Sequence, residues 1–392
     1  MQRLVVDDRG WLSQHQFNHA LSFCLLLPGP EAQQLATYIG WSLKGVRGAF
    51  LAGVLFVLPG ALIMLGLSLV YVSLGQTGLI DGLLFGLKCA VLAIVSQALA
   101  RMAGKLVAGP WALAITVAAF VAMFVLDLPF PLVLLTAALV GWWVFAASPL
   151  AIASTVPERP VAWVAALAVL AGWLLPLLLL LLVFGADSIW TQLAGFFSLV
   201  SVLSFGGAYA VLAWVAQYAA EQQAWVSAGE MLDGLGLAET TPGPLILVTQ
   251  FVGFLASWRE SGSLPPILAG MLGAGLTTWM MFAPSFFWVF LLAPLVERLR
   301  RHAGIAGALR GIAAAVVGVI ANLAAWFALR LLFAELKTVE VGWFSLQLPL
   351  PGSLDPLALV LSLGALGLLF LTRLGLVSVV LLSGLAGWLS SL

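Results

Sequence analysis

The chain has 392 residues, of which 63% are apolar and only 8% are charged, and its formal net charge is zero. Soluble domains are about 45–50% apolar and about 25% charged, so this chain has too few charges to cover a water-facing surface. A mean hydropathy of +1.13 points the same way. The composition argues against a soluble enzyme and against a nucleic-acid-binding protein. It suffices for roughly a dozen spans of about 20 residues, which predicts a polytopic protein of the lipid bilayer.

Residues that hold metals and cofactors are sparse. Cys24 and Cys89 lie in apolar stretches, and His15, His19 and His302 lack the spacing of a zinc-binding helix. The Gly-rich stretches do not follow a strand in a βαβ unit, as a dinucleotide site requires. We therefore expect no metal site, no cofactor and no enzymatic activity. The polar N-terminus, mixed in charge, also lacks the pattern of a signal peptide.

In chain order, charges, prolines and glycines divide the sequence into about twelve long apolar segments. These runs do not alternate with period two, as strands of a membrane barrel would, so the backbone must satisfy its hydrogen bonds as helices. We predict an all-α fold in which all segments cross the membrane. The segments are 17–43, 46–74, 79–101, 106–125, 128–147, 161–184, 192–219, 231–257, 264–296, 305–333, 356–372 and 374–391. The longer connections, 148–160 and 337–355, are too short to be domains.

The sequence repeats internally. The second copy follows the first at an offset of 214 positions at its start and of 225 positions further on, where it carries an extra loop. A shared register over this length indicates a duplication. We predict a first repeat at 1–147, a linker and connecting helix at 148–190, and a second repeat at 191–392. The matched residues include Trp11 with Trp225, Ser13 with Ser227, Pro28-Gly29-Pro30 with Pro242-Gly243-Pro244, Pro59 with Pro284, Gly86 with Gly311, and Gln97 with Asn322.

The two copies differ at their starts. The second begins with an apolar segment that contains Phe205-Gly206-Gly207, ahead of Trp225, whereas only ten residues precede Trp11. We therefore expect the first repeat to lack this FGG helix.

Basic residues predict the topology, because Lys and Arg concentrate at cytoplasmic helix ends. The clusters are Lys44 with Arg47, Arg101 with Lys105, and 298–301. If every segment crosses, all of these clusters lie in the cytoplasm. If 231–257 only dipped into the membrane and returned, 298–301 would lie outside, so we predict full crossing. The first PGP segment then runs inward and the second outward, which makes the two halves inverted repeats.

Each PGP tripeptide lies in the middle of an apolar segment. Two prolines two residues apart remove two backbone donors and break a helix. The second half-helix then presents free N–H groups and a positive dipole end, which suits an anion. Paired broken helices in inverted halves are typical of transporter substrate sites. The alternative is a pair of proline kinks that serve helix packing.

Carboxylates cluster at these breaks, at Glu239 and Asp233 before the second PGP and at Glu31 after the first. A buried carboxylate in lipid is costly and usually has a partner or a task. We predict that these three couple transport to protons, with Glu239 the best candidate. The alternative is that they cap helix ends or meet water.

Cations and polar groups complete the predicted substrate site. Lys88 lies deep in an apolar segment, and Arg310 stands at a similar depth in the second repeat. Both would attract a dianion, although an ion pair with one of the carboxylates is an equal alternative for Lys88. The predicted substrate-binding residues are Pro28, Gly29, Pro30, Gln34, Lys88, Phe205, Gly206, Gly207, Thr240, Thr241, Pro242, Gly243, Pro244 and Arg310.

The combination of FGG followed by WVS, DGLGLAETTPGPL, and LLLPGPEAQQLATYIG in the other half resembles the chromate ion transporter family in its long, two-repeat form. The resemblance covers 11–391 and departs from the family pattern by lacking the first FGG helix. It implies chromate efflux from the bacterial cytoplasm across the inner membrane, driven by the proton motive force and conferring chromate resistance. Family motifs place FGG at Phe205–Gly207 and the PGP motifs at Pro28–Pro30 and Pro242–Pro244.

The expected function is therefore secondary active export of chromate. The alternatives are transport of sulfate or another tetrahedral oxyanion, and a non-transporting membrane subunit. Symport and antiport, and a monomer and a homodimer, are not distinguished by the sequence.

Overall fold

The computed structural model describes residues 1–24, 27–74, 78–145, 162–205, 207–293, 303–341, 344–372 and 374–391. The predicted all-α class is confirmed, since these residues are mainly helical. Five of the described helices are long and apolar enough to cross a membrane, and several shorter apolar helices accompany them. They do not confirm the predicted number of about twelve crossings.

Up to residue 184, the described residues form only helices and the turns between them. The elements are η1 (Arg3–Asp8), α1 (Gln14–Cys24), α2 (Glu31–Leu74), α3 (Gly78–Leu106), α4 (Pro110–Phe124), α5 (Phe130–Val144) and α6 (Trp163–Phe184). The backbone leaves the helical conformation inside α2 at Lys44 and Gly45, so α2 is a half-helix followed by a long helix.

The second part contains more elements. They are α7 (Ile189–Leu203), α8 (Ala208–Gln217), η2 (Tyr218–Gln222), α9 (Ala228–Thr240), η3 (Leu245–Leu247), α10 (Val248–Arg259), α11 (Pro266–Leu292), α13 (Ala303–Leu332), β1 (Leu336–Val341), β2 (Phe344–Pro349), η5 (Pro351–Ser353), α14 (Pro356–Leu371) and α15 (Leu376–Ser390). The antiparallel hairpin β1–β2 lies in the connection 337–355, which we predicted to be too short to form a domain.

The local structure repeats in the register found in the sequence. A π-helical turn precedes both matched tryptophans, and each makes the same closing bond: Trp11 N–H donates to the Val5 carbonyl and Trp225 N–H to the Ala219 carbonyl, both at 2.8 Å. A reciprocal cap then starts the next helix in both copies, Ser13 with Gln16 in the first and Ser227 with Glu230 in the second. The duplication therefore extends to individual hydrogen bonds.

The two repeats interlock by exchanging helices. The pair α4 and α5 packs on α13 of the other repeat, and the pair α14 and α15 packs on α3. Glycines allow the closest approach at equivalent places. A β-carbon added at Gly141 would lie 2.7 Å from Cα of Gly311, and one added at Gly387 would lie 2.7 Å from Cα of Gly86.

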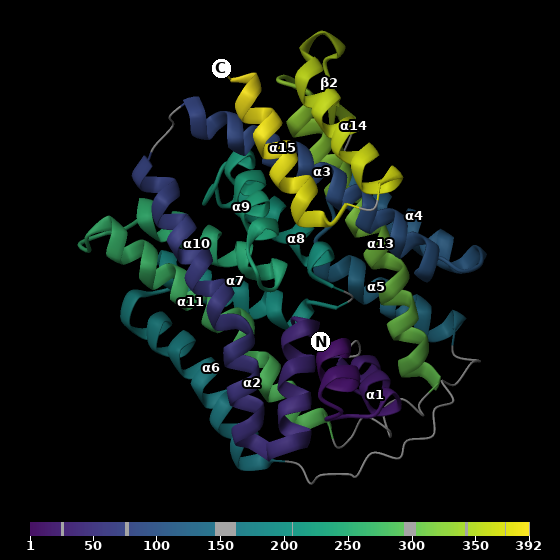
Figure 1. The fold of residues 1–392 in the computed structure, drawn as a ribbon, viewed down its shortest axis with the longest axis vertical. Coiled ribbons are helices and arrows are strands. Elements are labelled where there is room, and N and C mark those ends of the chain that lie inside the picture. Colours follow the sequence, from purple (N-terminus) through teal and green to yellow (C-terminus); the bar gives the residue numbers. More distant parts are fainter. Residues whose placement is uncertain are drawn as a thin grey trace.

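The molecule divides into two groups of helices (Figure 1). One contains α2, α6, α10 and α11, and the other contains α3, α4, α5, α13, α14 and α15, with α8 and α9 between them. In the first group, the ring of Phe50 stacks on Phe286 at 4.9 Å and contacts Phe290 at 5.5 Å. Because Phe50 lies near the start of the long part of α2 and Phe290 near the end of α11, these matched helices run antiparallel.

The predicted full crossing of 231–257 is wrong. The Arg259 guanidinium at the end of α10 donates to the carbonyl of Trp225, 2.7 Å away, so both ends of the segment lie together. The arms α9 and α10 form a helical hairpin with PGP at its tip. The topology argument failed because it assumed that an interrupted apolar segment continues in one direction.

Other segments fold back in the same way. In 17–43, the ring of Phe23 on α1 packs against Tyr38 on α2 at 5.0 Å. In 192–219, which we expected to be one helix, Phe196 on α7 stacks on Tyr218 after α8 at 3.9 Å. The expected inward and outward runs of the PGP segments are therefore also wrong: each enters and returns. The basic cluster at 298–301 lies outside the described residues.

Candidate functional site

The FGG hairpin (α7–α8) contacts both PGP hairpins near their tips. Pro28–Pro30 forms the tip between α1 and α2, and the backbone N–H of Gly29 donates to the Ser204 carbonyl, 2.8 Å away, at the tip between α7 and α8. Gly29 has a φ of 123°, which favours glycine. Gln34 braces this tip, because its side-chain amide donates to the Pro28 carbonyl at 2.6 Å. The first PGP motif therefore contacts the residue directly before the FGG motif of the other repeat. Within that motif, Gly206 lies outside the described residues.

Each PGP tip also touches a long helix of the opposite repeat, at the prolines matched in the sequence. A β-carbon added at Gly29 would lie 2.9 Å from Oγ of Ser285, the residue after Pro284. A β-carbon added at Gly60, the residue after Pro59, would lie 2.9 Å from the carbonyl oxygen of Pro242. Each PGP tip thus contacts the residue that follows the matched proline of the opposite repeat.

A hydrogen bond joins the second PGP hairpin to the FGG hairpin. The Tyr209 hydroxyl donates to a carboxylate oxygen of Glu239, 2.8 Å away. The next residues end α9, because the hydroxyls of Thr240 and Thr241 both donate back to the carbonyl of Leu237, at 2.7 and 2.8 Å. Glu239 therefore lies beside the tip with a polar partner from another hairpin.

Helix N-termini gather at these tips. The first backbone N–H groups of a helix have no helical partner, and the helix dipole makes this end positive. The arrangement presents unpaired donors where an oxyanion could bind. The second arm of each hairpin begins at its tip: α2 at Glu31 directly after Pro30, α8 at Ala208 directly after Gly207, and η3 at Leu245 directly after Pro244.

Lys88 is paired. Its ammonium lies 3.0 Å from one carboxylate oxygen of Asp233, and the Tyr71 hydroxyl donates to the other carboxylate oxygen at 3.0 Å. Asp233 lies in α9 seven residues before Thr240, about 10 Å from the tip along the helix. The alternative interpretation of Lys88, an ion pair with a carboxylate, matches this geometry.

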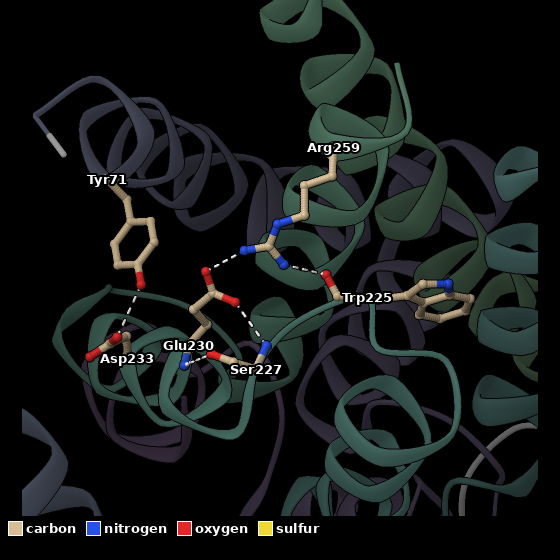
Figure 2. Close-up of polar contacts among 6 residues, drawn as sticks. All are labelled: Tyr71, Trp225, Ser227, Glu230, Asp233 and Arg259. Atoms are coloured by element: carbon tan, nitrogen blue, oxygen red, sulfur yellow. Dashed lines mark hydrogen bonds and ion pairs between the residues drawn. The ribbon is translucent and has the colours of Figure 1, made fainter. Parts of the chain in front are cut away.

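A cavity of about 560 Å³ opens beside this ion pair. Its polar lining includes Tyr71, Lys88 and Asp233, together with Glu230 and Arg259 at the base of the hairpin. Figure 2 shows how Glu230 faces Arg259 while also closing the cap with Ser227, and how Tyr71 points to Asp233. The cavity lies at the hairpin base, so it is distinct from the tips.

The remaining predicted residues are placed differently. Arg310 is exposed on α13, and no hydrogen bond or ion pair joins it to the tips among the described residues. Sequence reasoning missed Tyr71, Tyr209 and Ser204. The chain has only four tyrosines, and two of them hydrogen-bond to the carboxylates of Asp233 and Glu239. Their rarity in apolar segments was the available signal.

Apolar spanning helices, interlocked repeats and discontinuous helices that contact one another near their breaks define a multi-pass membrane transporter. A family model described as Chromate transporter matches residues 1–142 and 191–388. The chain belongs to the chromate transporter family, as its sequence motifs predicted.

Individual relatives with similar sequences carry names from the same family. The chain is 31% identical over 405 residues to the chromate transport protein of Pseudomonas aeruginosa, covering 99% of this chain and 86% of that protein. It is 26% identical to the chromate transport protein of Cupriavidus metallidurans, over 82% of this chain and 74% of that protein. It is also 26% identical to a probable chromate transport protein of Synechococcus elongatus, over 82% of this chain and 77% of that protein. No solved structure matches the chain.

Proposed function

We propose that this protein is a secondary active transporter that exports chromate from the bacterial cytoplasm across the inner membrane and so confers chromate resistance. The observation that carries the proposal is the presence of helix N-termini at the PGP and FGG tips. Backbone N–H groups at helix N-termini bind oxyanions without a metal or cofactor. The substrate-binding roles of Pro28–Pro30, Phe205–Gly207 and Thr240–Pro244 belong to this proposal.

The proposed mechanism is alternating access around the tips. Hairpin arms divide between the helix groups: α7 and α10 pack on α11, whereas α8 packs on α13 and α9 packs on α3. Movement of one group relative to the other would therefore open the tips to one side and close them to the other. In transporters with repeated halves, such motion about a fixed site is the usual mechanism.

The proposed topology places the basic ends in the cytoplasm. Lys44 and Arg47 lie at the turn inside α2. The contact between Phe290 and Phe50 places the end of α11 beside this turn. The end of α11 therefore lies on the same side as Lys44 and Arg47. With both PGP segments folded back, one hairpin enters from each side of the membrane. This supports inverted repeats, by a different route from the one expected.

The proton coupling that we propose depends on Glu239. Its carboxylate lies beside the second tip and is half-buried, with Tyr209 as its hydrogen-bond partner. Protonation would remove the negative charge that opposes a dianion at the tip. Asp233 and Glu31 are the other proposed carriers, and Asp233 is already held by Lys88.

Uptake of radiolabelled chromate into inverted membrane vesicles tests the proposal. We expect uptake that depends on an imposed pH gradient, that collapses with a protonophore, and that the Glu239→Gln variant uncouples from pH. Excess sulfate measures selectivity between the two tetrahedral dianions. Absence of gradient-dependent uptake would instead indicate a non-transporting membrane subunit. Homodimer formation stays a prediction, which light scattering of the purified protein tests.

A further inference from the structure

Beside the first PGP tip lies a set of buried polar side chains with unused oxygens. The side chains of Gln33, Gln34, Thr37 and Ser285 are 0% exposed. The amide oxygens of both glutamines, the hydroxyls of Thr37 and Ser285, and one carboxylate oxygen of Glu31 are buried without a hydrogen-bond partner. Buried polar groups in proteins are nearly always paired, so each such atom needs an explanation.

Three of these residues, Gln33, Gln34 and Ser285, lie together at the contact of α2 with α11. The amide nitrogen of Gln33 donates to the Phe282 carbonyl at 3.2 Å, one helical turn before Ser285. The amide nitrogen of Gln34 and Oγ of Ser285 both lie within 3 Å of the β-carbon position of Gly29, at 2.7 and 2.9 Å. Thr37 follows one turn after Gln33 on the same helix face. With both amide nitrogens engaged, the atoms left over are oxygens.

The second repeat shows that the hairpin folds without these groups. At the offsets of 214 and 225 positions, every one of the five has an apolar counterpart, although the second hairpin has the same architecture. Packing of a PGP hairpin against the opposite long helix therefore does not require polar side chains at these five positions. In the second hairpin the polar contact to the long helix comes from another position, Gln250, whose amide nitrogen donates to the Ala61 carbonyl at 2.9 Å. The counterparts of Glu31, Gln33, Gln34, Thr37 and Ser285 are Leu245, Leu247, Val248, Phe251 and Gly60.

The chemistry of the set identifies its ligand class. Amide, hydroxyl and carboxylate oxygens are ligands for hard cations, and amide oxygens would repel an oxyanion. Glu31 supplies a single negative charge to otherwise neutral oxygens, which matches a monovalent cation. In transporters with discontinuous helices, coupling cations bind beside the break.

We propose that Glu31, Gln33, Gln34, Thr37 and Ser285 form a sodium site beside the first PGP tip. The site deepens the proposed transport function, because a cation bound there would link α2 to α11 while the tip holds the anion. Its existence is nevertheless testable without any transport.

Thermal unfolding of the purified full-length protein in detergent tests the site directly. The protein is compared in sodium, potassium and choline chloride at equal ionic strength and pH, without chromate. A ligand that binds only the folded state raises Tm with its concentration. We expect sodium to raise Tm by about 2 °C or more over choline at concentrations well above half-saturation. Equal Tm values in all three salts would overturn the proposal.

Variants locate the effect. Gln33→Leu introduces the residue found in the second hairpin, and Ser285→Ala removes only a hydroxyl, so both should fold and both should lose the sodium shift. Thr249→Val is the matched control, because the Thr249 hydroxyl is already bonded to the Ile246 carbonyl at 2.7 Å in the other hairpin, and it should keep the shift. A sodium shift that persists in Gln33→Leu and Ser285→Ala would contradict the assignment. Because chromate is absent, failure here leaves the chromate-uptake experiment unaffected.

Discussion

The two PGP hairpins share their architecture and differ at their tips. Pro28, Gly29 and Pro30 are buried, whereas Pro242 and Gly243 are exposed. The first tip is covered by the FGG hairpin through the bond from Gly29 to Ser204. Among the described residues of the first repeat, no hairpin corresponds to α7–α8, so no equivalent hairpin covers the second tip. The second tip contacts Gly60 of α2.

Some features of the molecule occur in both repeats, and others occur in only one repeat. Both repeats share the close glycine contacts between helices, the helix caps at Ser13 and Ser227, and the contact of each PGP tip beside a matched proline. These shared features build the interlocked fold. Features confined to one copy, such as the polar set at Gln33 and the ion pair at Lys88, are not needed to build both halves. Substitutions at shared positions should therefore act alike in both halves, and substitutions at unshared positions should not.

The largest expected effect is at the shared glycine contacts. Gly86→Val and Gly311→Val each place a branched side chain against the backbone of the opposite repeat, at Ser383 and Ala137. Backbone atoms cannot rotate away, so we expect little folded protein from either variant. Fluorescence size-exclusion chromatography of detergent extracts measures the folded fraction.

Gly66→Val on α2 is the control, because a β-carbon there meets nothing within 4 Å. It should give a monodisperse peak close to that of the unmodified protein. If Gly86→Val and Gly311→Val differed strongly from each other, the equivalence of the two interlocked contacts would be contradicted.

A smaller effect is expected at the Lys88–Asp233 ion pair, which is confined to one copy. The positions matched to Asp233 and Lys88 in the other copy hold His19 and Ala313. The side chains of Lys88 and Asp233 are 22% and 6% exposed, and removal of one partner from such a pair leaves an uncompensated charge. We expect Lys88→Met to lower the free energy of unfolding by about 3 kcal/mol, measured by thermal unfolding.

The double variant Lys88→Met with Asp233→Asn distinguishes a structural pair from an anion contact. Both roles predict that stability recovers, because no unpaired charge remains. A purely structural Lys88 predicts a normal apparent KM for chromate in the double variant. A Lys88 that also attracts the anion predicts a KM that stays raised.

The repeat and its register could be predicted from the sequence, because Trp11, the first PGP motif and Pro59 each match an identical residue or motif at one of two offsets. The sequence also placed Glu239 and both PGP motifs at the helix breaks, where the structure has them. The sequence did not predict the hairpins. A long apolar segment with a central break is equally consistent with a helix that crosses the membrane and with a hairpin that returns to the same side. The contact that decides, from Arg259 to Trp225, joins residues 34 positions apart. The bond from Tyr209 to Glu239 was missed for the same reason, since it joins different hairpins.

The tips themselves provide a matched pair of substitutions. Gly29→Ala puts a β-carbon on a residue with φ of 123° and near Gln34 and Ser285, which should cost about 1–3 kcal/mol and reduce chromate uptake. Gly243→Ala meets only a methyl group of Leu247 at 3.1 Å and Cα of Gly60 at 3.2 Å, so its loss of stability should be smaller. Thermal unfolding and vesicle uptake of both variants measure the difference, and equal losses of stability would contradict the unequal coverage of the tips.

The smallest expected effect is at the hairpin base. Glu230 pairs with Arg259 and also caps α9, whereas its counterpart Gln16 caps α1 without a charge. Glu230→Gln therefore gives the second hairpin the cap of the first and removes only the ion pair. Because the Arg259 side chain is 37% exposed, the loss in thermal unfolding should be at most about 1 kcal/mol and should shrink at high salt. The bond from Arg259 to the Trp225 carbonyl remains in this variant, so the hairpin should still close. A loss much larger than this would show that the charge, rather than the cap and the backbone contact, holds the two arms together.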